Sequence, residues 1–285
     1  MNEYLRQQHE EITRKIIEAI EAGTAPWQRP WDGRGGPHNA GSGRAYTGIN
    51  NIVLTLKGEE IDGEHDPRWL TYKQASDKGW QVKKGAKGTH VILWKPYGEE
   101  DEDGNMEIKA VWQKVYTVFH ASQIEGIGEY IPPVWNEIEL QEKAERIIEA
   151  SGAKIIFGGN RAFFSPAGDF IKVPERGYFY TVAGYYSTML HELVHWTGGK
   201  TRLNRRHLEY AQEELVAEMG SMFLSAATGI PQTEQNFNND AEYIRGWLSR
   251  VSDKDKPSAI FRAAADANKA VDYLLKAVNG EGETK

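Results

Sequence analysis

Cysteine is absent from this 285-residue sequence, and long apolar runs are absent too. Without cysteine the chain can form neither disulfides nor thiolate metal sites, and it can fold in a reducing compartment. No stretch approaches the roughly 18 consecutive apolar residues of a membrane-spanning helix. The first residues also lack the basic-then-apolar pattern of a secretion signal. We therefore expect a cytoplasmic protein with no membrane partner.

The length and composition indicate a folded protein with more than one domain. Hydrophobic residues make up 40% of the chain and charged residues 26%, as is usual for globular proteins. A chain of 285 residues exceeds the usual size of one domain. The turn-forming run Ile131-Pro132-Pro133 marks a boundary. We therefore expect an N-terminal domain of residues 1–130 and a C-terminal domain of residues 131–285.

Hydrophobic periodicity predicts a mixed chain of the α+β class. We expect helices over residues 3–22, 52–56, 69–79, 137–151, 214–228, 240–251 and 259–278, and another around His191. Strands are expected over residues 91–94, 110–119, 154–157, 161–164 and 170–173. The last of these is expected to be an edge strand, where an extended peptide could pair with the sheet.

The most informative motif is His191-Glu192-Leu193-Val194-His195. Histidines four residues apart on a helix lie on one face, so both imidazoles can reach a single Zn²⁺. Glu192 is then placed to take a proton from the activated water and to return it to the leaving amine. A lone buried histidine usually only serves the core, but two histidines and a glutamate on an apolar helix need polar partners. The motif therefore predicts a zinc site, and another divalent ion is compatible with it.

A second helical segment offers the third protein ligand that a catalytic zinc site requires. Glu214 and Glu218 are four residues apart and share one helical face. We favour Glu214 as the ligand and Glu218 as the carboxylate that holds a histidine ligand from outside, although the opposite assignment stays open. Tyr185, Tyr186 and His207 are candidates, by residue type alone, for stabilising the transition state.

Charge is unevenly distributed along the chain. The net charge of −7 argues against nucleic acid, yet residues 68–97 contain seven basic residues and one acidic residue. A cationic surface with aromatic rings is what single-stranded DNA requires, whereas lysines alone usually form a solvated face. Trp69, Trp80 and Trp94 are expected in the core. The residues expected to contact DNA are Trp27, Arg29, Trp31, Arg44, Tyr46, Asn50, Lys73, Lys83, Lys84 and Lys87.

Several short segments carry a resemblance to a known family. In the first half they are Pro26-Trp27 with Pro30-Trp31, Arg44-Ala45-Tyr46-Thr47-Gly48-Ile49-Asn50, Trp69-Leu70-Thr71-Tyr72-Lys73-Gln74-Ala75, Val82-Lys83-Lys84-Gly85 and Gln123-Ile124-Glu125-Gly126. In the second half they are residues 189–198 around the histidine motif, Arg202-Leu203-Asn204-Arg205 and residues 210–218. On these segments nearly the whole chain resembles the ArdC-type antirestriction proteins of conjugative plasmids. The chain departs from the family at Phe119-His120, where Phe-Asn is usual.

The resemblance implies an N-terminal α+β domain that binds single-stranded DNA and a C-terminal, mostly α, zincin-like metallopeptidase domain of the gluzincin or SprT-like kind. It also implies protection of incoming plasmid DNA from host restriction during conjugation. Two alternatives stay open. One is a DNA-tethered metallopeptidase that cleaves a host protein or a protein crosslinked to DNA. The other is a partner-binding module without activity, in which zinc only holds the fold.

Overall fold

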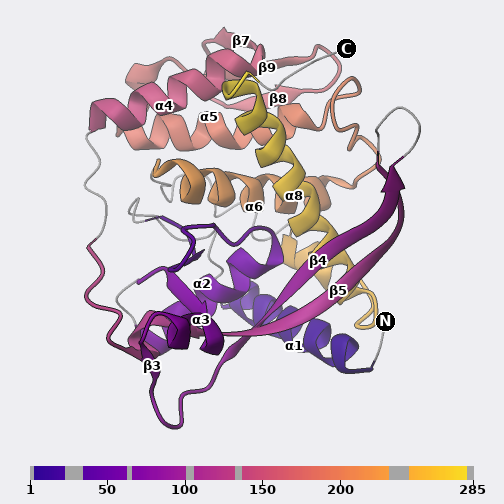
Figure 1. Cartoon of the computed structure of the whole chain (residues 1–285). Coiled ribbons are helices and arrows are strands. Elements are labelled where there is room, and N and C mark those ends of the chain that lie inside the picture. Colours follow the sequence, from indigo (N-terminus) through magenta and orange to yellow (C-terminus); the bar gives the residue numbers. More distant parts are fainter. Residues whose placement is uncertain are drawn as a thin grey trace.

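Sheets and helices mix in the N-terminal half, whereas helices dominate the C-terminal half, which confirms the predicted α+β class (Figure 1). The computed structural model describes residues 3–22, 35–62, 66–100, 106–131, 137–230 and 244–280. The elements of the first half are α1 (Glu3–Glu21), β1 (His38–Asn39), α2 (Ile49–Asp62), β2 (Arg68–Thr71), α3 (Tyr72–Asp77), β3 (Gln81–Val82), β4 (Thr89–Glu100), β5 (Met106–His120), η2 (Ala121–Gln123) and β6 (Ile124–Glu125). Those of the second half are α4 (Glu137–Ser151), β7 (Lys154–Phe157), β8 (Phe163–Ser165), β9 (Phe170–Val173), η3 (Arg176–Tyr178), α5 (Val182–Thr197), α6 (Tyr210–Thr228) and α8 (Lys256–Val278), and residues 244–248 are also helical.

The main sheet of the first half has the strand order β1-β2-β5-β4. Strands β4 and β5 form a long antiparallel hairpin, which pairs from Thr89 with Val118 to Glu100 with Met106. This hairpin extends as an arm along one side of the molecule (Figure 1). Strands β3 and β6 form a separate two-stranded sheet next to α3. The turn after β3, which carries several lysines, is therefore held at the end of the molecule away from α5 (Figure 1).

The expectation of one helix over residues 69–79 is wrong in its first part. Trp69 and Leu70 belong to β2 and pair with His120 and Phe119 of β5. The helix α3 begins only after Thr71, whose side chain accepts a hydrogen bond from the backbone of Gln74 in a capping box. Tertiary strand pairing thus overrides the local helical pattern. Both side chains are buried, and the prediction that Trp69 lies in the core is confirmed.

The small sheet of the second half has the strand order β7-β9-β8. The expectation that residues 170–173 form an edge strand is wrong, because β9 lies between β7 and β8. It pairs in parallel with β7 and antiparallel with β8, so its backbone groups are used on both sides. Ile171 and Val173 point into the core and are fully buried. The edges that could accept an extended peptide are therefore β7 and β8.

One buried hydrophobic cluster joins the two halves of the chain. Ile12, Ile16 and Ile20 recur every four residues, so they line one face of α1, and that face is buried. They share the cluster with side chains of α5, α6 and α8, and α8 contacts α1, α2, α4, α5 and α6. The core thus crosses the boundary expected near residue 130, and that boundary stays a prediction.

Candidate metal centre

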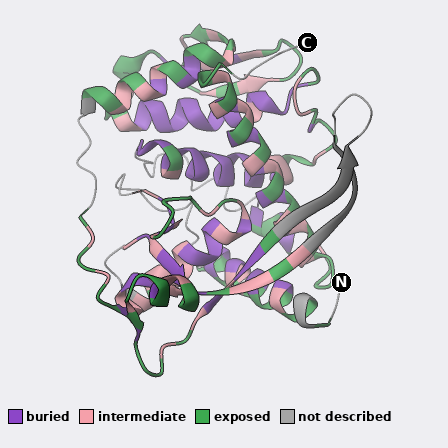
Figure 2. Ribbon diagram, viewed as in Figure 1, coloured by how far each residue is buried: buried purple, intermediate pink, exposed green. Residues whose placement is uncertain are grey.

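Helix α5 carries the two histidines and is one of the most deeply buried elements (Figure 2). It begins at Thr181, whose hydroxyl accepts a hydrogen bond from the backbone of Gly184 at 3.0 Å. Apolar side chains occupy almost every face, as expected for a helix in the middle of a core. His191 and Glu192 are buried in this helix and His195 is half-buried. Buried polar groups in such a setting require partners.

The partners come from α6, which packs directly against α5. A Cβ atom added to Gly220 would lie only 2.8 Å from Cγ1 of Val194, so glycine permits the close approach of the two helices. Helix α6 ends at Gly229, whose φ of 79° is the left-handed conformation that glycine adopts without strain. Because the helices approach closely, the buried carboxylates of Glu214 and Glu218 reach the histidines of α5.

Three side chains from the two helices form a compact donor set. The Nε2 atoms of His191 and His195 are 3.2 Å apart. Oε2 of Glu214 lies 3.6 Å from Nε2 of His191 and 3.3 Å from Nε2 of His195. Ligands at about 2.05 Å from a tetrahedral zinc ion are about 3.3 Å apart, so this triangle fits one divalent ion. His191, His195 and Glu214 are also the group of described residues whose spacing could hold a metal.

The other ring nitrogen of each histidine faces a second carboxylate. Nδ1 of His191 lies 4.0 Å from Oε1 of Glu218, and Nδ1 of His195 lies 3.4 Å from Oε1 of Glu213. A carboxylate at this position orients a histidine ligand and fixes which nitrogen faces the metal. The orienting role expected of Glu218 stays a prediction, and Glu213, which sequence reasoning missed, lies in the corresponding position beside His195.

Glu213 is itself held by Arg205, whose side chain is only 3% exposed. The guanidinium donates two hydrogen bonds to the Glu213 carboxylate, at 3.0 and 2.7 Å. It also donates to the backbone carbonyl of Val194 and to the hydroxyl of Thr197, both at the end of α5. The loop between α5 and α6 thereby ties the metal helices together. Only the folded loop brings Arg205 to Glu213, so motif spacing could not identify the pair.

Electrostatics in the cluster favour positive histidines and negative glutamates. Burial opposes protonation of the imidazoles, but hydrogen bonds to Glu214 and Glu213 outweigh it, so the pKa of His191 is raised and that of His195 lies well above its ordinary value. Burial likewise opposes ionisation of Glu214, but hydrogen bonds from both histidines bring its pKa below the usual range. The carboxylates thus stabilise the protonated form of each histidine, and the histidines stabilise the ionised form of Glu214.

Metal affinity is expected to rise with pH. Ligation requires neutral imidazoles, and the raised pKa values mean that an incoming ion must displace protons. Each displaced proton increases the apparent affinity about tenfold per pH unit until the raised pKa is passed. Competition with a chromophoric chelator between about pH 6 and pH 9 would measure this slope. A flat profile would contradict it.

The stability of the metal-free protein is expected to change in the opposite direction. A histidine whose folded pKa is raised above 6.5 stabilises the fold fully below that value. Its contribution is lost as the pH rises through the folded pKa. Thermal melts in chelator should therefore show falling stability on the alkaline side, and saturating metal should remove that trend.

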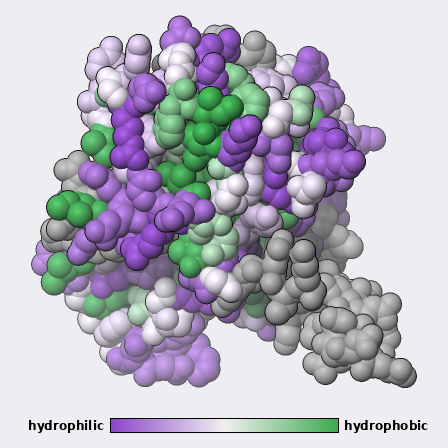
Figure 3. Space-filling view, turned by 90° about the horizontal axis from the view of Figure 1, so that it is seen from above, coloured by the Kyte–Doolittle hydropathy of each residue, from purple (hydrophilic) through white to green (hydrophobic). Residues whose placement is uncertain are grey.

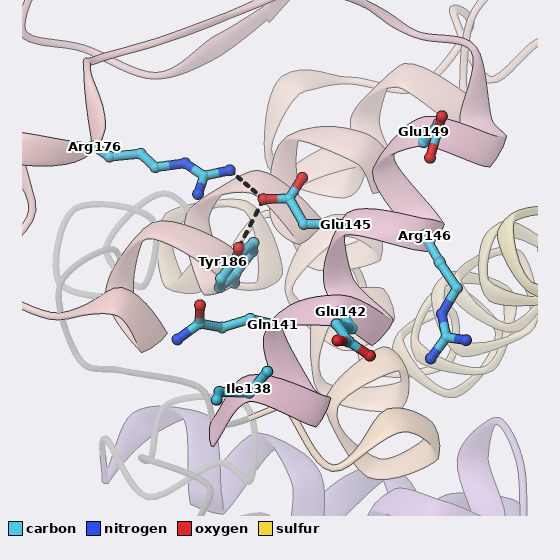
Figure 4. A pocket seen from close by; sticks show the side chains of 8 residues that line it. All are labelled: Ile138, Gln141, Glu142, Glu145, Arg146, Glu149, Arg176 and Tyr186. Atoms are coloured by element: carbon cyan, nitrogen blue, oxygen red, sulfur yellow. Dashed lines mark hydrogen bonds and ion pairs between the residues drawn. The ribbon is translucent and has the colours of Figure 1, made fainter. Parts of the chain in front are cut away.

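The tyrosines proposed as transition-state stabilisers are engaged elsewhere. The hydroxyl of Tyr186 donates a 2.7 Å hydrogen bond to Glu145, which also pairs with Arg176 (Figure 4). Burial and this bond raise the pKa of Tyr186 to about 12. The Arg176 guanidinium lies over the rings of both Tyr185 and Tyr186. Tyr186, Glu145 and Arg176 line a hollow of about 450 Å³ between α4, η3 and α5, and none of the three metal donors lines it. His207 is exposed in the loop before α6.

The small sheet presents apolar side chains to solvent. Ile156 and Phe157 of β7 and Phe163 of β8 are exposed. These strands lie at the top of Figure 1, and the view onto that end shows apolar patches among hydrophilic side chains (Figure 3). Both open edges of the sheet are therefore bordered by hydrophobic groups.

The residues expected to contact DNA differ in exposure and in their partners, and some of them lie outside the described residues. Trp27, Arg29 and Trp31 lie outside the described residues, as does the side chain of Trp94. Asn50 exchanges two hydrogen bonds with the backbone of Ile92, at 2.7 and 2.8 Å, so its amide supports strand β4. Tyr46 is half-buried against the cluster around Trp69, and Arg44 is exposed. Lys73 pairs with Asp77, whereas Lys83, Lys84 and Lys87 are exposed on the turn after β3.

Comparisons with known proteins match both halves of the chain. The family model for the N-terminal domain of anti-restriction factor ArdC matches residues 6–119, and that for a zincin-like metallopeptidase matches residues 142–266. The crystal structure of metal-free ArdC from the R388 plasmid is 35% identical, with a TM-score of 0.76 over 95% of this chain and 98% of that chain. The Mn(II)-bound structure of ArdC is 36% identical, with a TM-score of 0.75 over 97% and 99% of the two chains.

Curated relatives fall into two kinds. An uncharacterized protein, y4eC, from Sinorhizobium fredii is 32% identical over 93% of this chain and 91% of its own length. Two Escherichia coli proteins described as DNA primase TraC are 41% and 40% identical over 94% and 96% of this chain. The chain spans only 20% and 28% of the lengths of these two primases. No helix in the described part of the chain is long and apolar enough to cross a membrane.

Proposed function

This chain belongs to the ArdC antirestriction family, and from that membership we propose that it binds single-stranded DNA and protects incoming plasmid DNA from host restriction during conjugation. The observation that carries the proposal is the likeness to ArdC from R388 across 98% of that chain. The exposed lysines after β3 supply positive charge on the N-terminal half despite the net charge of −7. Such a surface can follow a phosphate backbone without reading its sequence.

Two measurements test this function. A labelled single-stranded oligonucleotide is expected to bind more tightly than a duplex of the same sequence, with affinity that falls as salt rises. Loss of the protein is expected to lower plasmid transfer into a restricting recipient and to leave transfer into a non-restricting recipient unchanged. Equal affinity for duplex, or equal losses in both recipients, would reject the proposal.

The zincin-like domain and its divalent metal site favour a second function, peptide hydrolysis. His191, His195 and Glu214 would hold the ion. We propose Zn²⁺, although the similar ArdC protein from R388 has been solved with Mn(II) bound. When bound, the ion supplies Lewis-acid polarisation of water and of the scissile carbonyl. Glu192, buried next to His191, would accept the proton of the attacking water and donate it to the leaving amine.

The orienting carboxylates complete this arrangement. Glu213 would accept the Nδ1 proton of His195, and the charge of Glu218, 4.0 Å from Nδ1 of His191, would favour a proton on that nitrogen, so that each Nε2 lone pair faces the ion. The substrate would then be a host protein or a protein crosslinked to the bound DNA. The competing possibility is a metal that only stabilises the fold. A variant of Glu192 distinguishes the two possibilities, because only peptide hydrolysis requires this side chain.

A further inference from the structure

A hollow of about 560 Å³ lies on the N-terminal half between α3, the turn after β3 and the end of β5. Its size is that of a site for a small organic group. Tyr72, Lys83, Lys84 and Phe119 contribute rings and positive charges to its lining, together with Gln81 and Glu125. We propose that this hollow holds one unpaired nucleotide of single-stranded DNA, with the base against Tyr72 and a neighbouring phosphate on Lys83 and Lys84. The inference rests on the proposed DNA-binding function and assigns a place to it.

Tyr72 supplies an exposed ring on a backbone that is held in place. Its residue is 56% exposed, although it lies beside the well-packed strand β2. The backbone at this point is held by the capping box of Thr71 and Gln74, and Asn39 donates to the Gln74 side chain at 3.0 Å. An exposed aromatic ring on a rigid backbone loses little conformational entropy when a base stacks on it. Phe119, half-buried on the neighbouring strand, supplies the apolar wall.

The lysines are presented by a turn that is fixed on both sides. The backbone N–H of Lys83 donates to the carbonyl of Gln123 at 2.9 Å, and the Gln123 side chain donates to the carbonyl of Lys87 at 3.1 Å. Gly85 has a φ of 83°, which lets the chain turn tightly between Lys84 and Lys87. The cationic side chains are therefore carried on an ordered support.

The charges of Lys83 and Lys84 remain available for an anion. Among the described residues neither ammonium has a carboxylate within ion-pair distance, and Lys83 donates only to the backbone carbonyl of Ser122, at 2.8 Å. Lys73 differs, because Asp77 lies 3.0 Å from its ammonium. Glu125 on the lining disfavours a phosphate at its own side of the hollow. The phosphate is therefore placed at the lysines and the base toward the ring.

The test uses the full chain and a fluorescein-labelled oligothymidylate. Tyr72→Ala is expected to weaken binding about tenfold, because stacking is lost, whereas Tyr72→Phe retains the ring and the affinity. The matched control is Tyr180→Ala, which removes an even more exposed ring (92%) from the other half and should leave the affinity unchanged. Lys84→Gln should lower the slope of log affinity against log salt by about 0.7, whereas Lys254→Gln, an exposed lysine before α8, should not.

The outcomes separate the two proposals. If the unaltered protein binds no oligonucleotide, the proposed function fails. If it binds but Tyr72→Ala and Tyr180→Ala have equal affinities, only the hollow is rejected. Melting temperatures show whether each variant is folded. Should Tyr72→Ala be unfolded, photocrosslinking of an iododeoxyuridine oligonucleotide to the unaltered protein decides: a crosslink within residues 72–87, or at Phe119 or Glu125, supports the site, and crosslinks only elsewhere overturn it.

Discussion

Replacing Glu192 with glutamine is expected to slow peptide hydrolysis by about 10²- to 10⁴-fold, the contribution of a positioned acid–base group. Glutamine keeps the size of the side chain but cannot accept the proton of the attacking water. The three metal donors stay in place, so metal content and oligonucleotide affinity should remain those of the unaltered protein. Fluorescently labelled casein, incubated with and without a single-stranded oligonucleotide, provides the rate, and elemental analysis provides the metal content.

The matched control is Glu139→Gln, an exposed glutamate on α4 far along the chain from the metal helices. It should retain full activity. Equal rates for Glu192→Gln and the unaltered protein would remove Glu192 from the chemistry. Fully metal-loaded protein that cuts no probe, but unfolds when the ion is chelated, would favour a metal that only holds the fold.

Replacing Glu214 and Glu218 of α6 with glutamine, one at a time, is expected to show which of the two carboxylates binds the metal. Loss of an outer carboxylate typically costs about 10- to 100-fold in metal affinity, and this is expected for Glu218→Gln. Glu214→Gln should cost more, because its Oε2 lies within 3.6 Å of both Nε2 atoms and completes the donor triangle. Competition with a chelator measures both affinities at one pH.

Thermal melts supply an independent readout of the same ranking. Metal at about 100 times its dissociation constant stabilises a folded protein by about 2.7 kcal/mol. The unaltered protein should show this shift on adding Zn²⁺ or Mn²⁺, and Glu214→Gln should show none at the same metal concentration. A smaller effect for Glu214→Gln than for Glu218→Gln would transfer the ligand role to Glu218.

Local periodicity and spacing were sufficient for the helices that build the metal site. The apolar pattern around His191 predicts a buried helix, and the four-residue spacing of His191 and His195 puts both imidazoles on one face. A second acidic helix follows from the same argument. What these patterns do not contain is the distance between the helices, which depends on the glycine at position 220.

The features that the sequence did not reveal depend on contacts between distant segments. The position of β9 inside its sheet is decided by pairing with β7 and β8, and no property of residues 170–173 alone distinguishes a central strand from an edge. Arg205 reaches Glu213 only because the loop after α5 folds back. The sequence predicts that Asn50 can hydrogen-bond a base, but its amide is already hydrogen-bonded to the backbone of Ile92, 42 residues away in β4.

The buried cluster shared by α1, α2 and the metal helices has a consequence for inheritance. Cutting away either half would expose apolar side chains of this cluster to water, so we expect recombination that preserves function to move both halves together. The long primase relatives fit this rule, since each aligns with at least 94% of this chain inside a much longer polypeptide. We therefore expect the N-terminal and C-terminal halves to be inherited together as one unit.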